Sequence, residues 1–186
     1  NYYEFVGTDG DTYYGEVTIK PATTFDLRIA GTQVSTNNCA DLSTIPGVSG
    51  KASYDPGTKT LTLQNAKLNA ESGNCIRSKI DGLTIKVSGT NELNAESAIA
   101  IFIEAPATIT GGGTLNAKSQ SNRAVLVDRA DLTIDNCTVN AKGKWGITGS
   151  FGLKENLSIN NATVTAEGWA GSICDFNEIT LEGCAI

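Results

Sequence analysis

Apolar and polar residues alternate with period two through most of the chain after Thr60, which is the pattern of half-buried β-strands. One phrase of this kind recurs six times, as LTLQNAKLNA, LTIKVSGTNELNA, ATITGGGTLNA, LTIDNCTVNA, LSINNATVTA and ITLEGCAI. Aligned on their central aliphatic residue, the phrases share the column Leu63, Ile85, Ile109, Ile134, Ile159 and Leu181, spaced by 22 to 25 residues. This period, without a helical stripe, indicates stacked coils. The sequence predicts an all-β fold, a single-stranded right-handed parallel β-helix (β-solenoid) with about 22–25 residues per coil.

The alternation also assigns the outward side of the strands. One outward column is expected to contain Thr62, Thr84, Thr108, Thr133, Ser158 and Thr180, and another Asn69, Asn94, Asn116, Asn140 and Thr165. Like polar side chains stacked at about 4.8 Å can hydrogen-bond along the ladder, so their first role is structural. A second strand in each coil is expected at Ile76, Ile99, Val125, Ile147 and Ile173.

Residues 1–60 do not carry the repeat and are expected to form an N-terminal β-strand and hairpin cap, followed by the repeats over 61–186 in one structural domain. Within the cap, Asp55-Pro56-Gly57 is typical of a hairpin turn. The chain stops at Ile186 inside an expected strand. Either the native protein continues, or this end is covered by a partner or an N-terminal strand, so end-to-end self-association is a possible consequence.

Composition narrows the partners. The 186 residues carry a formal net charge of −6 and contain no histidine, so the basic patches of nucleic-acid binders are missing and no nucleic acid is expected. No apolar run approaches the roughly 20 residues that span a bilayer, so membrane attachment would need an anchor outside this chain. The first residue is Asn rather than Met, so a removed export signal stays open.

Metal and disulfide chemistry are weakly indicated. Asp9, Asp11 and Glu16 could offer oxygen ligands to calcium, but a plain Asp-Gly hairpin explains them better, so neither a metal site nor a cofactor is predicted. Among five cysteines, only a bridge between Cys39 and Cys75 stays open.

The pattern argues against catalysis. Parallel β-helices of this coil size resemble pectate lyases and polygalacturonases, which need clustered acids. The column beside the core aliphatics reads Gln64, Lys86, Thr110, Asp135, Asn160 and Glu182, so no carboxylate pair emerges. The Gly-His-Gly signature of polygalacturonases cannot exist without histidine. The charged cluster Arg123, Asp128 and Arg129 is interpreted as a solvated turn with local ion pairs.

The candidate binding site is aromatic. Trp145 and Trp169 follow similar dipeptides in successive coils and differ by 24 in number, so they are expected to lie above one another. Two exposed indoles would form a platform for sugar rings. Hydroxyl-binding residues beside it would be Asn140, Thr165, Lys144 and Glu167. The alternative is that both indoles fold over the corner and seal the core.

The segments Phe25 to Val34, Ser53 to Pro56 and Thr60 to Ala66 resemble secreted or surface β-solenoid proteins of gut bacteria, over about residues 25 to 186. Members of that group are mostly uncharacterised and are often described as carbohydrate-binding or adhesin-like. The resemblance implies a secreted or cell-surface location and supplies no site residue.

We therefore expect a non-catalytic extracellular binding or adhesion module whose partner is a polysaccharide or a glycoprotein glycan. Two alternatives stay open: a polysaccharide lyase-like or hydrolase-like enzyme, or its degenerate relative, and a structural spacer without a ligand.

Overall fold

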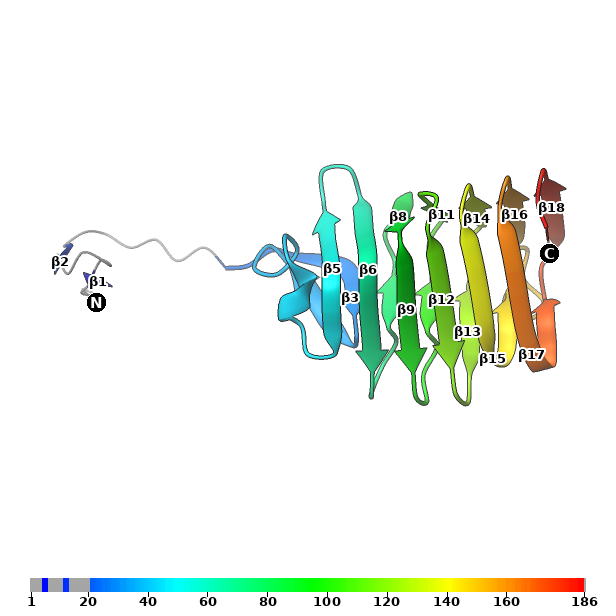
Figure 1. Cartoon of the computed structure of the whole chain (residues 1–186), viewed down its shortest axis with the longest axis horizontal. Helices are drawn as coiled ribbons and strands as arrows, with labels where there is room; N and C mark the ends of the chain where they lie inside the picture. The colour runs from blue at the N-terminus through cyan, green and yellow to red at the C-terminus, as the bar shows by residue number, and fades with distance from the viewer. Residues whose placement is uncertain (1–4, 7–11, 14–20, 186) are drawn as a thin grey trace.

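A computed structural model describes residues 5–6, 12–13 and 21–185 of the chain. It confirms the expected fold, because parallel strands stack into a β-solenoid of about five turns (Figure 1). The described residues contain no α-helix, and η1 (Leu42–Thr44) is a single 3₁₀ turn. The short strands β1 (Phe5–Val6) and β2 (Thr12–Tyr13) pair antiparallel in a separate sheet.

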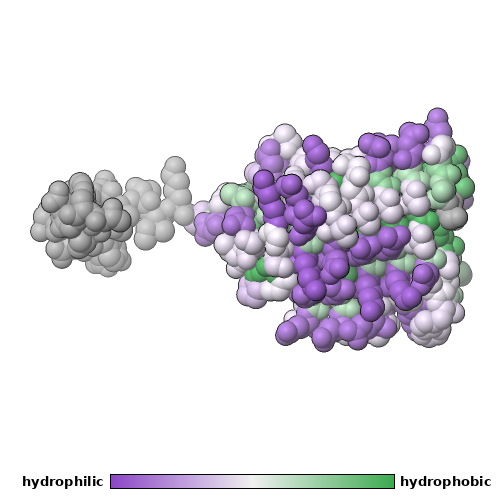
Figure 2. Space-filling model, viewed as in Figure 1, coloured by the Kyte–Doolittle hydropathy of each residue, from purple (hydrophilic) through white to green (hydrophobic). Residues whose placement is uncertain are grey.

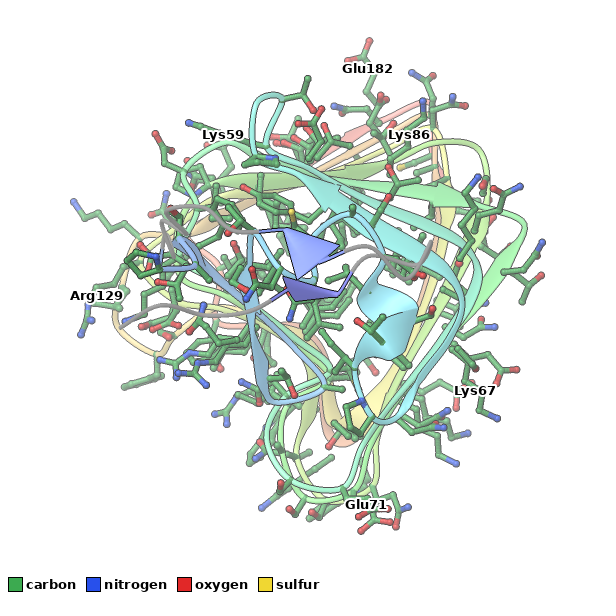
Figure 3. The ribbon with its side chains drawn as sticks, turned by 90° about the vertical axis from the view of Figure 1, so that its left-hand side faces the viewer. Lys59, Lys67, Glu71, Lys86, Arg129 and Glu182 are labelled. Atoms are coloured by element: carbon green, nitrogen blue, oxygen red, sulfur yellow. The ribbon has the colours of Figure 1, made fainter. Side chains whose placement is uncertain are left out.

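Each coil has three faces, which the view along the solenoid axis displays as a rounded triangle (Figure 3). The first face stacks the first half of β6 (Thr60–Ala70), β8 (Leu83–Ser88), β11 (Ala107–Thr110), β14 (Leu132–Asp135), β16 (Asn156–Asn160) and β18 (Glu178–Glu182). The second face stacks the second half of β6, β9 (Thr90–Ala95), β12 (Thr114–Ser119), β15 (Thr138–Thr148) and β17 (Thr163–Cys174). The third face stacks β7 (Ile76–Ser78), β10 (Ile101–Ile103), β13 (Arg123–Val127) and the last residues of β15 and β17.

The observed register corrects four alignments by two residues each. Leu61, not Leu63, lies opposite Ile85, so the threonine column begins at Thr60 rather than Thr62, and Thr62 replaces Gln64 beside Lys86. On the third face Ile101, not Ile99, lies between Ile76 and Val125. On the second face the asparagine column is broken, because Asn94 lies opposite Lys118 and Asn116 lies opposite Glu92. A shift of two keeps every side chain on its own side of the sheet, so alternation could not reveal it.

The coil interior is filled by aliphatic side chains, with one polar exception. Asn91 is fully buried in the column that continues as Leu115, Val139 and Val164. Its Oδ1 accepts a hydrogen bond from the Ala66 backbone N–H at 2.9 Å. Its Nδ2 donates to the carbonyl oxygens of Ser88 and Thr114 at 3.1 and 3.2 Å. Asn91 therefore joins three neighbouring coils from the inside.

The non-repeating segment before β6 covers the first coil. β3 (Thr24–Ile29) pairs antiparallel with β4 (Thr32–Ser35) and β7, while β5 (Val48–Asp55) pairs antiparallel with β6. The side chains of Leu27, Ile29 and Leu42 are fully buried against the repeats. The expected hairpin is present, and the Asp55 carboxylate accepts hydrogen bonds from the Gly57 N–H at 2.8 Å and from the Thr58 hydroxyl at 2.9 Å.

At the other end, the last coil exposes apolar side chains. Ile179 and Leu181 of β18 are 43% and 50% exposed. Hydrophobic surface gathers at this end of the molecule, whereas the face turned toward the viewer is mainly hydrophilic (Figure 2). Self-association through this end stays a prediction.

All five cysteines are free thiols, so Cys39 and Cys75 are not bridged. Cys75 and Cys137 are buried, and we call them the two buried thiols. Burial raises the pKa of Cys75 to about 12 and that of Cys137 to about 11. Thiols held neutral in this way behave as small apolar core residues.

Candidate functional site

The second face carries an open groove with a volume of about 310 Å³. It crosses β9, β12, β15 and β17, and its lining consists of amides, charged side chains and two alanines. These residues are Glu92, Asn94, Asn116, Ala117, Lys118, Asn140, Ala141, Lys142, Thr165 and Glu167. An adjoining hollow of about 300 Å³ continues toward the N-terminal coils and is lined by Asn69, Ala70, Glu71, Asn94, Ala95, Glu96, Lys118 and Gln120. Together they form one polar strip across several coils.

Outward rows of residues run along this strip because the strands pair in register. One row is Lys67, Glu92, Asn116, Asn140 and Thr165, and the next is Asn69, Asn94, Lys118, Lys142 and Glu167. Amides hydrogen-bond along both rows. Asn140 Nδ2 donates to Asn116 Oδ1 at 2.8 Å, and Asn94 Nδ2 donates to Asn69 Oδ1 at 3.0 Å. These bonds fix the orientation of the planar amides and leave part of their donors and acceptors for a ligand.

Most charges in the strip are paired. Lys67 Nζ lies 3.5 Å from Glu92 Oε2, and Lys142 Nζ lies 2.6 Å from Glu167 Oε2. Among the described residues, Lys118 has no carboxylate within 4.0 Å. The acids of the groove therefore neutralise lysines, and Lys118 remains as an uncompensated cation near its centre.

A corner with two tryptophans borders the groove, but the register differs from the expected one. Gly143 lies opposite Gly168, and a bulge between Gly143 and Trp145 places Trp145 opposite Gly171. The one-coil step is therefore 25 residues here, not 24, and Trp169 lies beside Lys144. The prediction that the two indoles lie above one another is wrong.

Cations occupy the space that the second indole was expected to fill. The Lys144 Nζ lies 4.4 Å from the ring centre of Trp145 and 5.1 Å from that of Trp169. The Arg123 Cζ lies 4.4 Å from the ring centre of Trp145. Trp145 is thus half-buried between stacked cations, whereas Trp169 is 80% exposed. Such cation–π contacts hold the cations against the rings without neutralising them.

The six predicted site residues therefore divide into two neighbouring groups. Asn140, Thr165 and Glu167 line the groove, whereas Trp145, Lys144 and Trp169 form the corner. The exposure of Trp169 contradicts the alternative in which both indoles seal the core.

Sequence reasoning missed three residues of the groove, namely Glu92, Lys118 and Lys142. The signal that could have found them is the alternation itself, because they stand two residues from the asparagines that were singled out.

Charged residues on the third face form structural pairs. Arg77 donates two hydrogen bonds to the Glu104 carboxylate, at 2.6 and 3.1 Å, and Lys79 Nζ lies 3.6 Å from the same carboxylate. The hydrogen bond from Arg77 is the main cause that lowers the pKa of Glu104. In the predicted charged turn, Arg129 lies 3.7 Å from Asp128, while Arg123 instead stacks on Trp145.

No group of three or more His, Cys, Asp or Glu residues gathers to hold a metal ion within the part of the chain that the structure describes. Asp9, Asp11 and Glu16 lie outside that part. Across the same residues, no helix has the length and apolar character needed to cross a membrane.

Comparison with known proteins adds no family. No family model matches the sequence, and no curated protein or solved structure is significantly similar to it. The resemblance to surface proteins of gut bacteria is therefore supported only in its solenoid fold.

Proposed function

We propose that this protein is a non-catalytic glycan-binding module that works outside the cell, either secreted or at the cell surface. The observation that carries the proposal is the polar groove of the second face, which ends beside the exposed indole of Trp169. Planar amides and lysines suit the vicinal hydroxyls of sugars, and an exposed indole suits the apolar face of a sugar ring. The partner is a polysaccharide or the glycan of a glycoprotein.

The pairing of charges favours binding over catalysis. Glu92 and Glu167 each lie within 4 Å of a lysine, so neither resembles a general acid with a raised pKa. A polysaccharide-cleaving enzyme, or its degenerate relative, and a spacer without a ligand remain the competing hypotheses. Membrane attachment would use an anchor outside this chain.

The test is a titration of the protein with neutral and acidic polysaccharides from plants, hosts and bacteria, followed by tryptophan fluorescence and calorimetry. We expect one class to shift the emission of an iodide-accessible indole. Trp169→Ala should then weaken binding by at least about tenfold, since base or sugar stacking on an indole contributes on the order of 1–3 kcal/mol. Phe151→Ala is the matched control, because Phe151 is 92% exposed but belongs to neither the groove nor the corner.

Two results would overturn the proposal. If no polysaccharide binds, the spacer hypothesis becomes the better one. If reducing ends accumulate in a mixture with any bound polysaccharide, the enzyme hypothesis replaces it.

A further inference from the structure

Three cations without an ion-pair partner border the groove and the tryptophan corner. Lys118, Arg123 and Lys144 each lack a carboxylate within 4.0 Å among the residues that the structure describes. The chain as a whole has a net charge of −6, with 20 acidic and 14 basic residues. An acidic protein has enough carboxylates to pair these cations, and Lys67 and Lys142 of the same strip are paired.

Two of the three cations are held in place by the indoles rather than by acids. Lys144 contacts both rings, and Arg123 contacts Trp145. The Nε atom of Arg123 is buried and has no hydrogen-bond partner within the described chain. Stacking orients a guanidinium or an ammonium group and partly removes its water, while its full charge remains available to an anion.

Lys118 extends this charge into the groove. It lies opposite Asn94 on one side and Lys142 on the other, and Lys142 is paired with Glu167. Like charges on neighbouring strands are unfavourable, so two adjacent lysines that share one glutamate leave one positive charge uncompensated. The positive charge thus continues from the Trp169 corner across β15 to β12.

Acidic residues limit the positive region on the N-terminal side. Glu71 and Glu96 line the adjoining hollow and form no ion pair with the described residues. The strip is therefore acidic toward the first coils and basic toward the last ones. An anionic ligand would be repelled from the first part and attracted to the second.

We infer that the glycan bound here is acidic and carries a carboxylate or sulfate group. Its sugar ring stacks on Trp169, and its anionic substituents contact Lys144, Arg123 and Lys118. This inference rests on the proposed glycan-binding function and adds the chemical class of the ligand. Hydrogen bonds to charged groups are stronger than neutral ones, which makes charge the main source of selectivity in this region.

The experiment compares matched polymers that differ only in charge. The carboxylate pair is hyaluronan and hyaluronan with its carboxylates reduced to alcohols, and the sulfate pair is dextran sulfate and dextran. We expect the anionic member of at least one pair to bind about tenfold or more tightly than its neutral counterpart, with an affinity that falls as salt rises. The pair that shows the preference identifies the anionic group.

Charge-neutralising variants locate the effect. Lys144→Gln should weaken binding of the anionic polymer by about tenfold and leave binding of any neutral polymer unchanged. Glu96→Gln should leave binding of the anionic polymer equal or stronger. Lys86→Gln is the control, because Lys86 is an exposed cation on the first face, away from the Lys67 row in the axial view (Figure 3).

The inference and the proposed function fail in different ways. Equal binding of charged and neutral polymers, or a Lys144→Gln variant that binds the anionic polymer like the wild type, overturns the acidic ligand and keeps the glycan. Absence of binding by every polymer in both pairs and in the wider panel overturns both.

Discussion

Replacement of Asn91 by leucine tests whether a buried amide, rather than apolar packing, holds neighbouring coils together. Asn91 stands in an apolar column and makes three hydrogen bonds to backbone groups of three coils. A hydrophobic-core argument alone would favour Asn91→Leu, because a fully buried leucine side chain contributes about 1.5–3 kcal/mol.

The lost hydrogen bonds outweigh that gain. The Ala66 N–H would be left buried without a partner, which costs about 1–3 kcal/mol, and each of two carbonyl oxygens would lose a bond of about 1 kcal/mol. We therefore expect Asn91→Leu to lower the free energy of unfolding by about 2 kcal/mol. Asn91→Ala has no compensating burial and should lower it by about 3–5 kcal/mol.

The assay is equilibrium urea unfolding followed by circular dichroism, with midpoints compared at equal slope. Asn94→Ala is the control, because its amide makes one hydrogen bond, to Asn69, on the outer side of the strand. It should change the free energy of unfolding by about 1 kcal/mol or less. An Asn91→Leu variant as stable as the wild type would show that packing, not the amide, dominates at this position.

Two further predictions concern titratable groups. The pKa of Glu104 is lowered by its hydrogen bond from Arg77, so this carboxylate stabilises the fold above its ordinary pKa and stops doing so as the pH falls through its folded pKa. Melting temperatures between pH 7 and pH 3 should therefore fall more for the wild type than for Glu104→Gln, and equal slopes would refute the role of the pair. The two buried thiols should not react with a thiol reagent at pH 8 in the native state, so at most three of the five cysteines should titrate before urea is added and all five afterwards; four or five reactive thiols in the native protein would contradict their burial.

The sequence was sufficient for the fold but not for its register. Alternation reports only which side of a strand faces the core, and shifts of two residues leave that assignment intact. This explains why Leu63 was aligned with Ile85 although Leu61 is its true neighbour, and why Ile99 was chosen although Ile101 belongs to the strand. Both errors fall in coils of unequal length, where counting alone gives two acceptable answers.

The candidate site was predictable in its parts and not in its arrangement. Tryptophan after a glycine at a coil corner identified Trp169 as a candidate, but the bulge between Gly143 and Trp145 has no signature in composition. That bulge puts Lys144 beside Trp169, so the predicted pair of indoles becomes an indole and a cation. Bulges depend on how each strand meets its neighbour, which a single sequence does not specify.

The long strands β15 and β17 run through the corner that the earlier coils form with turns between β6, β9 or β12 and the third face. Trp169 is therefore mounted on a strand that is paired with β15 on both sides of the corner, through Glu167 and Gly168 before it and Gly171 after it. A ligand that stacks on this indole meets a surface whose backbone is already ordered by its ladder hydrogen bonds. The conformational entropy that a recognition loop would lose on binding has here been lost during folding, so a larger share of the contact energy appears as affinity.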